Sequence, residues 1–132
     1  MLDWINKMLK DNFIEELGIE LVNYDDNKIK LKMKADSKLK APNGYIHGGA
    51  ITSLADTACG IATFMNIEEG QNFTTIELKT NFISAANIGD SLLCEAILIH
   101  KGRTTQVWDA EIINESNSKK IAIMRCTQFI FT

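Results

Sequence analysis

The stretch of sequence that decides the fold is residues 43–65, which read NGYIHGGAITSLADTACGIATFM. It begins with a turn, Asn43-Gly44, and from Gly48 onward it consists almost wholly of small and apolar residues. Asp56 is the only charged residue in it. A helix that is apolar on all sides is expected to be covered on all sides, so the rest of the chain has to wrap around it. The stretch therefore predicts a long, buried helix from Gly48 to about Met65.

The segments around this helix carry the pattern of β-strands. Before it, Ile29, Leu31 and Met33 alternate with lysines as in a half-buried strand, and the polar turn Asp25-Asp26-Asn27 joins them to a strand that starts at Ile19. After it, β-branched and aromatic residues dominate four segments that polar or glycine-containing turns separate. These four segments are residues 73–83, 91–100, 104–114 and 121–131.

This order of elements predicts an α+β fold, in which an antiparallel, curled sheet of about six strands wraps around the long central helix. The chain has 132 residues, the length of one ordinary domain, and we expect a single domain over residues 1–132. Residues 3–17 place apolar side chains at helical spacing. We therefore expect one amphipathic first helix with Asp3 as its N-cap and Gly18 at its end.

Composition and charge exclude several classes of partner. A net charge of -3 gives no long-range attraction to nucleic acid or to an anionic membrane, so we expect neither as a partner. Charged residues interrupt the apolar positions of residues 1–13, which breaks any signal-peptide core, and no other stretch reaches the roughly 20 apolar residues of a membrane span. The three cysteines are odd in number and widely separated. This pattern favours buried thiols in a reducing cytoplasm over disulfides or a metal site.

Two features of the central stretch indicate chemistry. The pair Gly48-Gly49 at the helix start leaves space for a ligand oxygen to approach backbone N–H groups, where the partial positive charge of the helix end favours an oxyanion. Asp56 has apolar neighbours such as Leu54 and Ala58, among which an unpaired carboxylate is costly to bury. On these residues alone, Asp56 either pairs with a buried donor or reacts with a substrate.

The segment His47-Gly48-Gly49, followed by Ser53-Leu54-Ala55-Asp56-Thr57-Ala58, resembles the signature of the hot-dog thioesterases of the phenylacetyl-CoA type, the PaaI-like family. The likeness extends over nearly the whole chain, including the strand 74–82 and the turns at 89–90 and 101–104. It implies a hot-dog fold and a hydrolase that cleaves an acyl- or aroyl-coenzyme A thioester. Coenzyme A is then part of the substrate, and no separate cofactor is expected.

The resemblance also implies roles for single residues. The backbone N–H of Gly48 would polarise the thioester carbonyl, and Asp56 would activate water as a general base or attack directly as a nucleophile. Thr75 matches a hydroxyl-bearing position that helps to hold the water. Gly49 would contribute to substrate binding, and His47 would either bridge the loop and the helix or contact the reacting group directly as a catalytic residue.

Two further segments have an ambiguous reading. Many relatives carry Asn or Gln six residues before the histidine, where its side chain touches the catalytic carboxylate or the substrate. This chain has Ala41 at that position, and Asn43 is the nearest amide. Asn43 either takes over this contact or is simply a turn residue. In relatives the turn Lys101-Gly102-Arg103-Thr104 lies near the nucleotide end of coenzyme A. Because Arg binds phosphate through a bidentate fork, Arg103, with Lys101 and Thr104, is expected to bind the substrate there, unless these residues are simply solvated.

The spacing within the central helix adds a separate deduction. Gly48 and Asp56 are eight residues apart, which separates their backbones by roughly 12 Å at 1.5 Å per residue. They cannot both reach one carbonyl carbon. A site that uses both must take Gly48 from one copy of the helix and Asp56 from another copy that lies antiparallel to it. We therefore expect a homodimer at least, and the spacing does not distinguish this dimer from a homotetramer.

Two other functions stay open from the sequence. A hot-dog dehydratase or hydratase would act on a 3-hydroxyacyl or enoyl thioester, and His47 would have to transfer the proton. A non-catalytic acyl-CoA-binding module would keep the fold without the reaction. In every case the packing of Phe64, Met65 and Phe82 between subunits would set the length of the acyl pocket.

Overall fold

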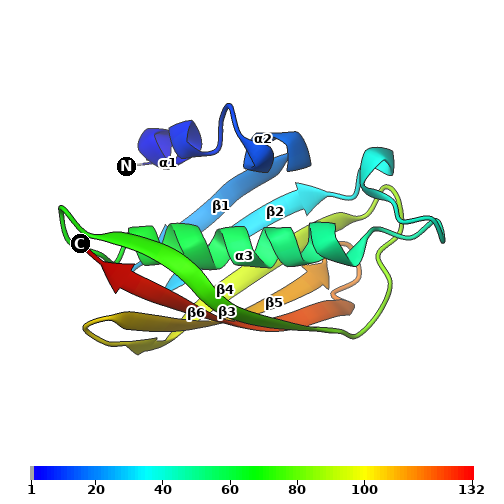
Figure 1. Ribbon diagram of the computed structural model, residues 1–132. Helices are drawn as coiled ribbons and strands as arrows, with labels where there is room; N and C mark the ends of the chain where they lie inside the picture. The colour runs from blue at the N-terminus through cyan, green and yellow to red at the C-terminus, as the bar shows by residue number, and fades with distance from the viewer. Residues whose placement is uncertain (1) are drawn as a thin grey trace.

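A computed structural model describes residues 2–132, which form a six-stranded antiparallel sheet curled around one long helix (Figure 1). The strands follow the order β1-β2-β4-β5-β6-β3 across the sheet. Their bounds are β1 Ile19–Asp25, β2 Lys28–Lys34, β3 Asn72–Phe82, β4 Ser91–Lys101, β5 Thr105–Asn114 and β6 Lys120–Phe131. The helices are α1 Leu2–Met8, α2 Phe13–Leu17, the 3-10 turn η1 Ser37–Leu39, and α3 Gly48–Phe64. The predicted α+β hot-dog architecture is confirmed.

The central helix α3 lies across the concave side of the sheet and packs on β2, β3, β4, β5 and β6 (Figure 1). Its buried residues are small or aliphatic, which lets the helix approach the strands closely: Ala50, Ile51, Leu54, Ala55, Ala58, Cys59, Ile61 and Ala62. Trp108, the largest fully buried side chain, belongs to the same core on β5. Removal of this apolar surface from water holds the helix and the sheet together.

The expectation that α3 is covered on every side is wrong for one stripe of the helix. Gly49 is exposed, and Ser53, Asp56 and Gly60 are only half-buried. These positions follow one another at intervals of three or four residues, so they share one face of the helix. The stripe is built of small residues around a single carboxylate, and in one chain it stays partly open to solvent.

The edge strand β3 lies beside this half-open face. It pairs with β6 on one side only, and no other element of the described chain, residues 2–132, adds a strand to its free edge. The β3–β6 register shifts between Thr75 and Glu77, which leaves Ile76 as a bulge. A bulge bends a strand and redirects the side chains next to it. Thr75 therefore points at α3 from a strand with an exposed edge.

The predicted single helix over residues 3–17 is wrong, because two short helices occupy this segment. The chain bends between α1 and α2 at Asp11, which has a φ of 59°. Asn12 then starts α2 by accepting hydrogen bonds from the N–H groups of Ile14 and Glu15. Asp3 lies inside α1 and is not its N-cap, whereas Gly18 ends α2 in the left-handed conformation as expected. Within residues 2–132, every helix is too short or too polar to cross a lipid bilayer.

Candidate active site

The N-terminus of α3 is capped by the side chain of His47. The backbone N–H of Gly49 donates to His47 Nδ1 at 2.8 Å, so this ring nitrogen carries no hydrogen. The cap satisfies one of the N–H groups that have no partner inside a helix. His47 thus joins the preceding loop to the helix, which is the structural role that the resemblance implies for it.

Gly48, the first residue of α3, keeps its N–H free of any hydrogen-bond partner within residues 2–132. A Cβ atom at this position would lie 2.9 Å from Cζ of Phe82, so the absent side chain leaves room for the tip of this ring. The N–H of Gly49 is already engaged by His47. Gly48 is therefore the donor at this helix end that remains available to a ligand oxygen.

Asp56 lies two turns further along α3, and its carboxylate is held on one side only. Thr75 Oγ1 donates to Asp56 Oδ1 at 2.9 Å, and Cys126 Sγ lies 4.0 Å from the same oxygen. The second oxygen, Oδ2, has no hydrogen-bond partner in the described part of the chain. No basic side chain forms an ion pair with Asp56 there either. The structure thus brings Thr75 and Asp56, two residues that the sequence analysis named, into direct contact.

Two residues near Asp56, Gln128 and Cys126, were not predicted as site residues from the sequence. Gln128, fully buried on β6, donates through Nε2 to Thr75 Oγ1 at 2.7 Å and contacts Cys126 Sγ at 3.1 Å. The signal that could have found Gln128 is its place at an inward position of β6, between the buried residues Cys126 and Ile130. An uncharged amide at such a position needs a buried partner.

The pKa values of the two thiols near Asp56, Cys59 and Cys126, are shifted in opposite directions. A hydrogen bond to Cys126, together with burial, raises the pKa of the Cys59 thiol. Burial also raises the pKa of Cys94, which lies on β4. All three cysteines are free and buried. Cys59 and Cys94 therefore stay protonated near neutral pH, whereas hydrogen bonds with Cys59, Gln128 and Thr75 lower the pKa of the Cys126 thiol.

Asn43 lies in the turn before α3, where its side-chain Oδ1 accepts from the N–H of Tyr45 at 3.1 Å. The same turn is closed by the hydrogen bond from Gly44 N–H to the carbonyl of Ala41. Asn43 therefore acts as a turn residue within its own chain. Because the turn precedes α3, it lies at the Gly48 end of the helix and more than two helical turns from Asp56 of the same chain.

The turn between β4 and β5 lies at the other end of α3. Lys101 and Arg103 line a hollow of about 240 Å³ together with the loop that follows α3, which contributes Glu68 and Gln71. Neither basic residue pairs with a carboxylate in the described chain. The backbone carbonyl of Thr104 accepts from the N–H of Ile130 and so fixes the turn to β6. Two unpaired cations thus flank a small hollow.

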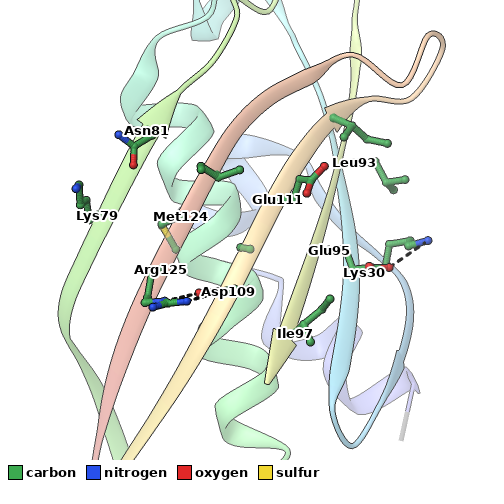
Figure 2. Close-up of a pocket in the computed structure, with 13 residues that line it drawn as sticks. Lys30, Lys79, Asn81, Leu93, Glu95, Ile97, Asp109, Glu111, Met124 and Arg125 are labelled. Atoms are coloured by element: carbon green, nitrogen blue, oxygen red, sulfur yellow. Dashed lines mark hydrogen bonds and ion pairs between the residues drawn. The ribbon is translucent and has the colours of Figure 1, made fainter. Parts of the chain in front are cut away.

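A larger cavity of about 620 Å³ lies on the opposite face of the sheet, away from α3 (Figure 2). Figure 2 shows Arg125 and Asp109 bonded side by side on its floor. Arg125 donates to the two carboxylate oxygens at 2.6 and 2.8 Å, and these hydrogen bonds hold the pKa of Asp109 below its usual value. Both oxygens of Asp109 are occupied, and the other two carboxylates that line the cavity, Glu95 and Glu111, form ion pairs with lysines.

Comparison with known proteins identifies similar chains. The sequence profile described as "Thioesterase superfamily" matches residues 43–121. The 1,4-dihydroxy-2-naphthoyl-CoA hydrolase of Listeria monocytogenes is 33% identical over 113 residues, covering 86% of this chain and 90% of that protein. The crystal structure of thioesterase HI1161 from Haemophilus influenzae superposes with a TM-score of 0.92 at 26% identity, covering 100% and 91% of the two chains. The E. coli PaaI protein from the phenylacetic acid degradation operon gives a TM-score of 0.87 at 26% identity, covering 97% and 91%.

Proposed function

The chain belongs to the thioesterase superfamily as a PaaI-like hot-dog thioesterase, and we propose that it hydrolyses acyl- or aroyl-coenzyme A thioesters with Asp56 as the reacting carboxylate. One observation carries the role of Asp56. Its carboxylate is half-buried beside an open face of α3, is oriented by Thr75 through one oxygen, and has its other oxygen free of partners within residues 2–132. This is the arrangement that a general base or a nucleophile requires.

The reaction needs a donor where negative charge develops. When water or Asp56 attacks the thioester carbon, the carbonyl oxygen becomes an oxyanion. The N–H of Gly48 has no partner in the described chain, and it belongs to the end of α3 that carries partial positive charge. We assign it the role of oxyanion donor. The C–S bond then breaks, the coenzyme A thiolate leaves and takes up a proton, and the acid is released.

An isotope-labelling experiment can distinguish whether Asp56 acts as a general base or as a nucleophile. As a general base, Asp56 takes a proton from water, and the oxygen of that water ends in the product acid. As a nucleophile, Asp56 forms an anhydride with the acyl group, and hydrolysis can leave the oxygen of water on the carboxylate. Repeated turnover in H₂¹⁸O followed by mass spectrometry of the peptide that contains Asp56 distinguishes them. Only the nucleophilic route labels this peptide.

The site is completed by a second copy of the chain. Gly48 and Asp56 lie on one continuous helix, α3, about 12 Å apart along its axis. The half-open stripe of α3 and the free edge of β3 are adjacent, and Ile76, Leu78 and Phe82 on β3 are exposed in the single chain. Exposed apolar side chains beside a free strand edge support an interface with another chain. We propose a homodimer in which α3 helices lie antiparallel.

Mixed dimers test this composite site. Asp56→Asn removes the carboxylate and Gly48→Pro removes the N–H, so each variant alone is expected to be nearly inactive. In a dimer that contains one subunit of each kind, one site receives both intact groups and the other receives neither. Unfolding and refolding an equimolar mixture should therefore restore about a quarter of the wild-type rate. A mixture as inactive as its components, in which mass spectrometry nevertheless shows mixed dimers, would place both groups in one chain.

The basic turn is the proposed contact of the nucleotide end of the substrate. Lys101 and Arg103 have no carboxylate partner in residues 2–132, and they border the hollow at the C-terminal end of α3. Phosphate groups of coenzyme A are suited to this place because Arg and Lys bind them directly. Thr104 would support the turn through its backbone, and Asn43 of the partner subunit is the amide we place nearest to the carboxylate.

Aromatic side chains support an aromatic acyl group among the possible substrates. Gly60 lies one turn beyond Asp56, and a Cβ atom there would be 3.7 Å from the ring of Phe73. The ring of Phe64 lies 6.1 Å from Phe73 and 4.6 Å from Trp4. A flat acyl group could pack against such rings. Aroyl thioesters therefore belong in the substrate panel beside short and long acyl chains.

The reaction itself is tested with a panel of acyl- and aroyl-CoA thioesters, monitored by release of free thiol. We expect equal amounts of acid and coenzyme A for the accepted substrates. Enoyl-CoA serves to detect hydration, because addition of water without release of thiol would favour a hydratase. His47 Nδ1 is already used in the helix cap, which does not favour that alternative. Binding of acyl-CoA without thiol release over hours would indicate a non-catalytic module.

Location and assembly complete the proposal. Three free, buried cysteines support a cytoplasmic location, because a reducing compartment keeps such thiols unpaired. Exposed isoleucines on the outer face of the sheet, Ile97, Ile99 and Ile123, support association of two dimers into a homotetramer. Sedimentation velocity at several protein concentrations measures both steps. An active species with the mass of one chain would contradict the composite site.

A further inference from the structure

A chain of hydrogen bonds leads from Asp56 into the sheet and ends at Gln128. Thr75 Oγ1 donates to Asp56 Oδ1 at 2.9 Å, and Gln128 Nε2 donates to Thr75 Oγ1 at 2.7 Å. Thr75 and Gln128 are direct partners in the β3–β6 register. The bulge at Ile76 follows Thr75 immediately and directs this part of β3 at the helix. Three elements, α3, β3 and β6, therefore contribute one side chain each.

The directions of these hydrogen bonds are set by the groups themselves. An ionised carboxylate only accepts, so the single hydrogen of the Thr75 hydroxyl must point to Asp56. The hydroxyl oxygen is then free to accept, and the amide of Gln128 has to present its nitrogen rather than its oxygen. The second hydrogen of this nitrogen is directed at Cys126 Sγ, 3.1 Å away. Gln128 thus fixes which way the Thr75 hydroxyl points.

The oxygen of the Gln128 amide, Oε1, is unfavourable for the stability of the folded chain. This atom is buried without a hydrogen-bond partner among residues 2–132. A buried carbonyl without a partner is a cost that an apolar side chain of the same size would avoid. The side chain is fully buried, so solvent does not satisfy this atom in the folded chain. Stability alone therefore does not account for a glutamine at this position.

We propose that Gln128 is a positioning residue for thioester hydrolysis, which acts through the Thr75 hydroxyl to orient the carboxylate of Asp56. The proposal rests on the assigned role of Asp56. By holding the hydroxyl on Oδ1, the pair Gln128 and Thr75 leaves Oδ2 of Asp56 directed to water or substrate. Gln128 itself does not touch the reacting atoms.

Gln128→Met tests this role, because methionine keeps the length of the side chain and removes both polar ends. We expect kcat to fall about 10-fold, since a misplaced reacting group loses part of its effective concentration. KM should stay within about twofold, because the substrate does not contact Gln128. The Tm should be unchanged or higher, because the unpaired Oε1 is gone. Gln128→Leu, which also removes both polar ends, should lower kcat as well.

A double-mutant cycle separates action through Thr75 from any other effect. Thr75→Val removes the hydroxyl, so adding Gln128→Met to this variant should change kcat by less than about twofold. Thr63→Val is the control for loss of a buried hydrogen bond, because the Thr63 hydroxyl donates to the Cys59 carbonyl at 2.8 Å and does not contact Asp56. Its kcat should equal that of the wild type even if its Tm falls.

The outcomes are distinct. A wild-type kcat in folded Gln128→Met, or the same loss of kcat in the presence and absence of the Thr75 hydroxyl, would overturn the positioning role. If Gln128→Met fails to fold, Gln128→Leu in the two Thr75 backgrounds gives the same comparison. Full hydrolysis by Asp56→Asn would instead overturn the proposed function. An inactive Asp56→Asn with an unaffected Gln128→Met would leave the function standing and remove only this inference.

Discussion

Asp56 and Asp109 are carboxylates on opposite sides of one sheet, and their surroundings differ in kind. Asp56 lies on the helix side, where a neutral hydroxyl holds one of its oxygens and no cation is paired with it in residues 2–132. Asp109 lies on the outer face, where Arg125 binds both oxygens in a fork (Figure 2). The outer cavity is the larger of the two hollows described above. The larger hollow thus contains a carboxylate with both oxygens occupied, whereas Asp56 lines neither hollow and keeps one oxygen free within residues 2–132. The difference shows that cavity size alone is a poor guide to a reactive carboxylate.

The most direct test of this difference is to replace each of the two carboxylates by an amide in turn and to compare kcat. Asp56→Asn should lower kcat roughly 10²–10⁴-fold, the usual contribution of a general base. Asp109→Asn makes the same chemical change on the outer face and should leave kcat unchanged. Both rates are measured by thiol release with the best substrate of the panel, after circular dichroism has shown that each variant is folded. Equal losses from the two variants would contradict the assignment of the helix side as reactive.

The second prediction concerns the N-terminal end of α3, where we propose that Gly48 is the oxyanion donor. Gly48→Pro removes the N–H and fits the helix, because proline is tolerated at the first helical position. His47, with φ -61° and ψ 133°, already has the extended conformation required before proline. We expect kcat to fall roughly 10²–10³-fold, as for loss of an oxyanion donor.

Gly48→Ala is the matched control for this variant. Both substitutions add a Cβ atom toward Phe82, whose ring is 54% exposed and can move aside, but alanine keeps the N–H. The ratio of the two rates therefore reports the N–H alone. If Gly48→Ala and Gly48→Pro have the same kcat, the oxyanion donor lies elsewhere.

The third prediction compares paired and unpaired cations. Lys30 on the outer face pairs with Glu95 at 3.6 Å, whereas Lys101 and Arg103 have no acidic partner in the described chain. Replacing both Lys101 and Arg103 by Gln should raise KM for acyl-CoA about 3- to 10-fold, with a smaller effect at high salt. Lys30→Gln should leave KM unchanged.

A truncated substrate tests whether the basic turn binds the phosphate groups of coenzyme A. The same acyl group on pantetheine keeps the thioester but lacks the phosphates of the nucleotide end. For this substrate the Lys101 and Arg103 variant should match the wild type in both kcat and KM. A loss of the same size on both substrates would show that the turn acts on the fold or on the thioester and does not bind phosphate.

The sequence predicts those parts of the molecule that local patterns determine. The apolar stretch from Gly48 and the alternation in β2 give α3 and the strands with boundaries close to those observed. Asp56 is conspicuous because it is a single charge in that stretch. The interruption of the first helix at Asp11 is harder to predict from the sequence. The apolar spacing continues through this residue, while its backbone adopts a positive φ.

Relations between distant segments could not be read from the sequence in the same way. Thr75 and Gln128 meet because the β3–β6 register places them opposite each other, and the shift at Ile76 changes which residues of β3 face the helix. Alternation in β6 alone shows only that Gln128 faces inward. The half-open stripe of α3 is also a property of the assembled sheet, because β3 is its edge strand. Residue types thus predict the carboxylate, and the register supplies its partners.

The smallest expected effect is on stability, at the outer-face pair Asp109 and Arg125. The hydrogen bonds from Arg125 lower the pKa of Asp109 in the folded chain, so folding favours the ionised carboxylate. The resulting stability is present above the pKa of the unfolded carboxyl group and is lost as the pH falls through the lower, folded value. Because the Asp109 side chain is 40% exposed and that of Arg125 65%, solvent screens the pair. Asp109→Asn should therefore lower Tm by at most about 3 °C at pH 7 and by less at 1 M salt or at acidic pH, as measured by thermal unfolding. A much larger loss that depends on protein concentration would show that the pair itself is buried in the contact between dimers that is proposed for Ile97, Ile99 and Ile123.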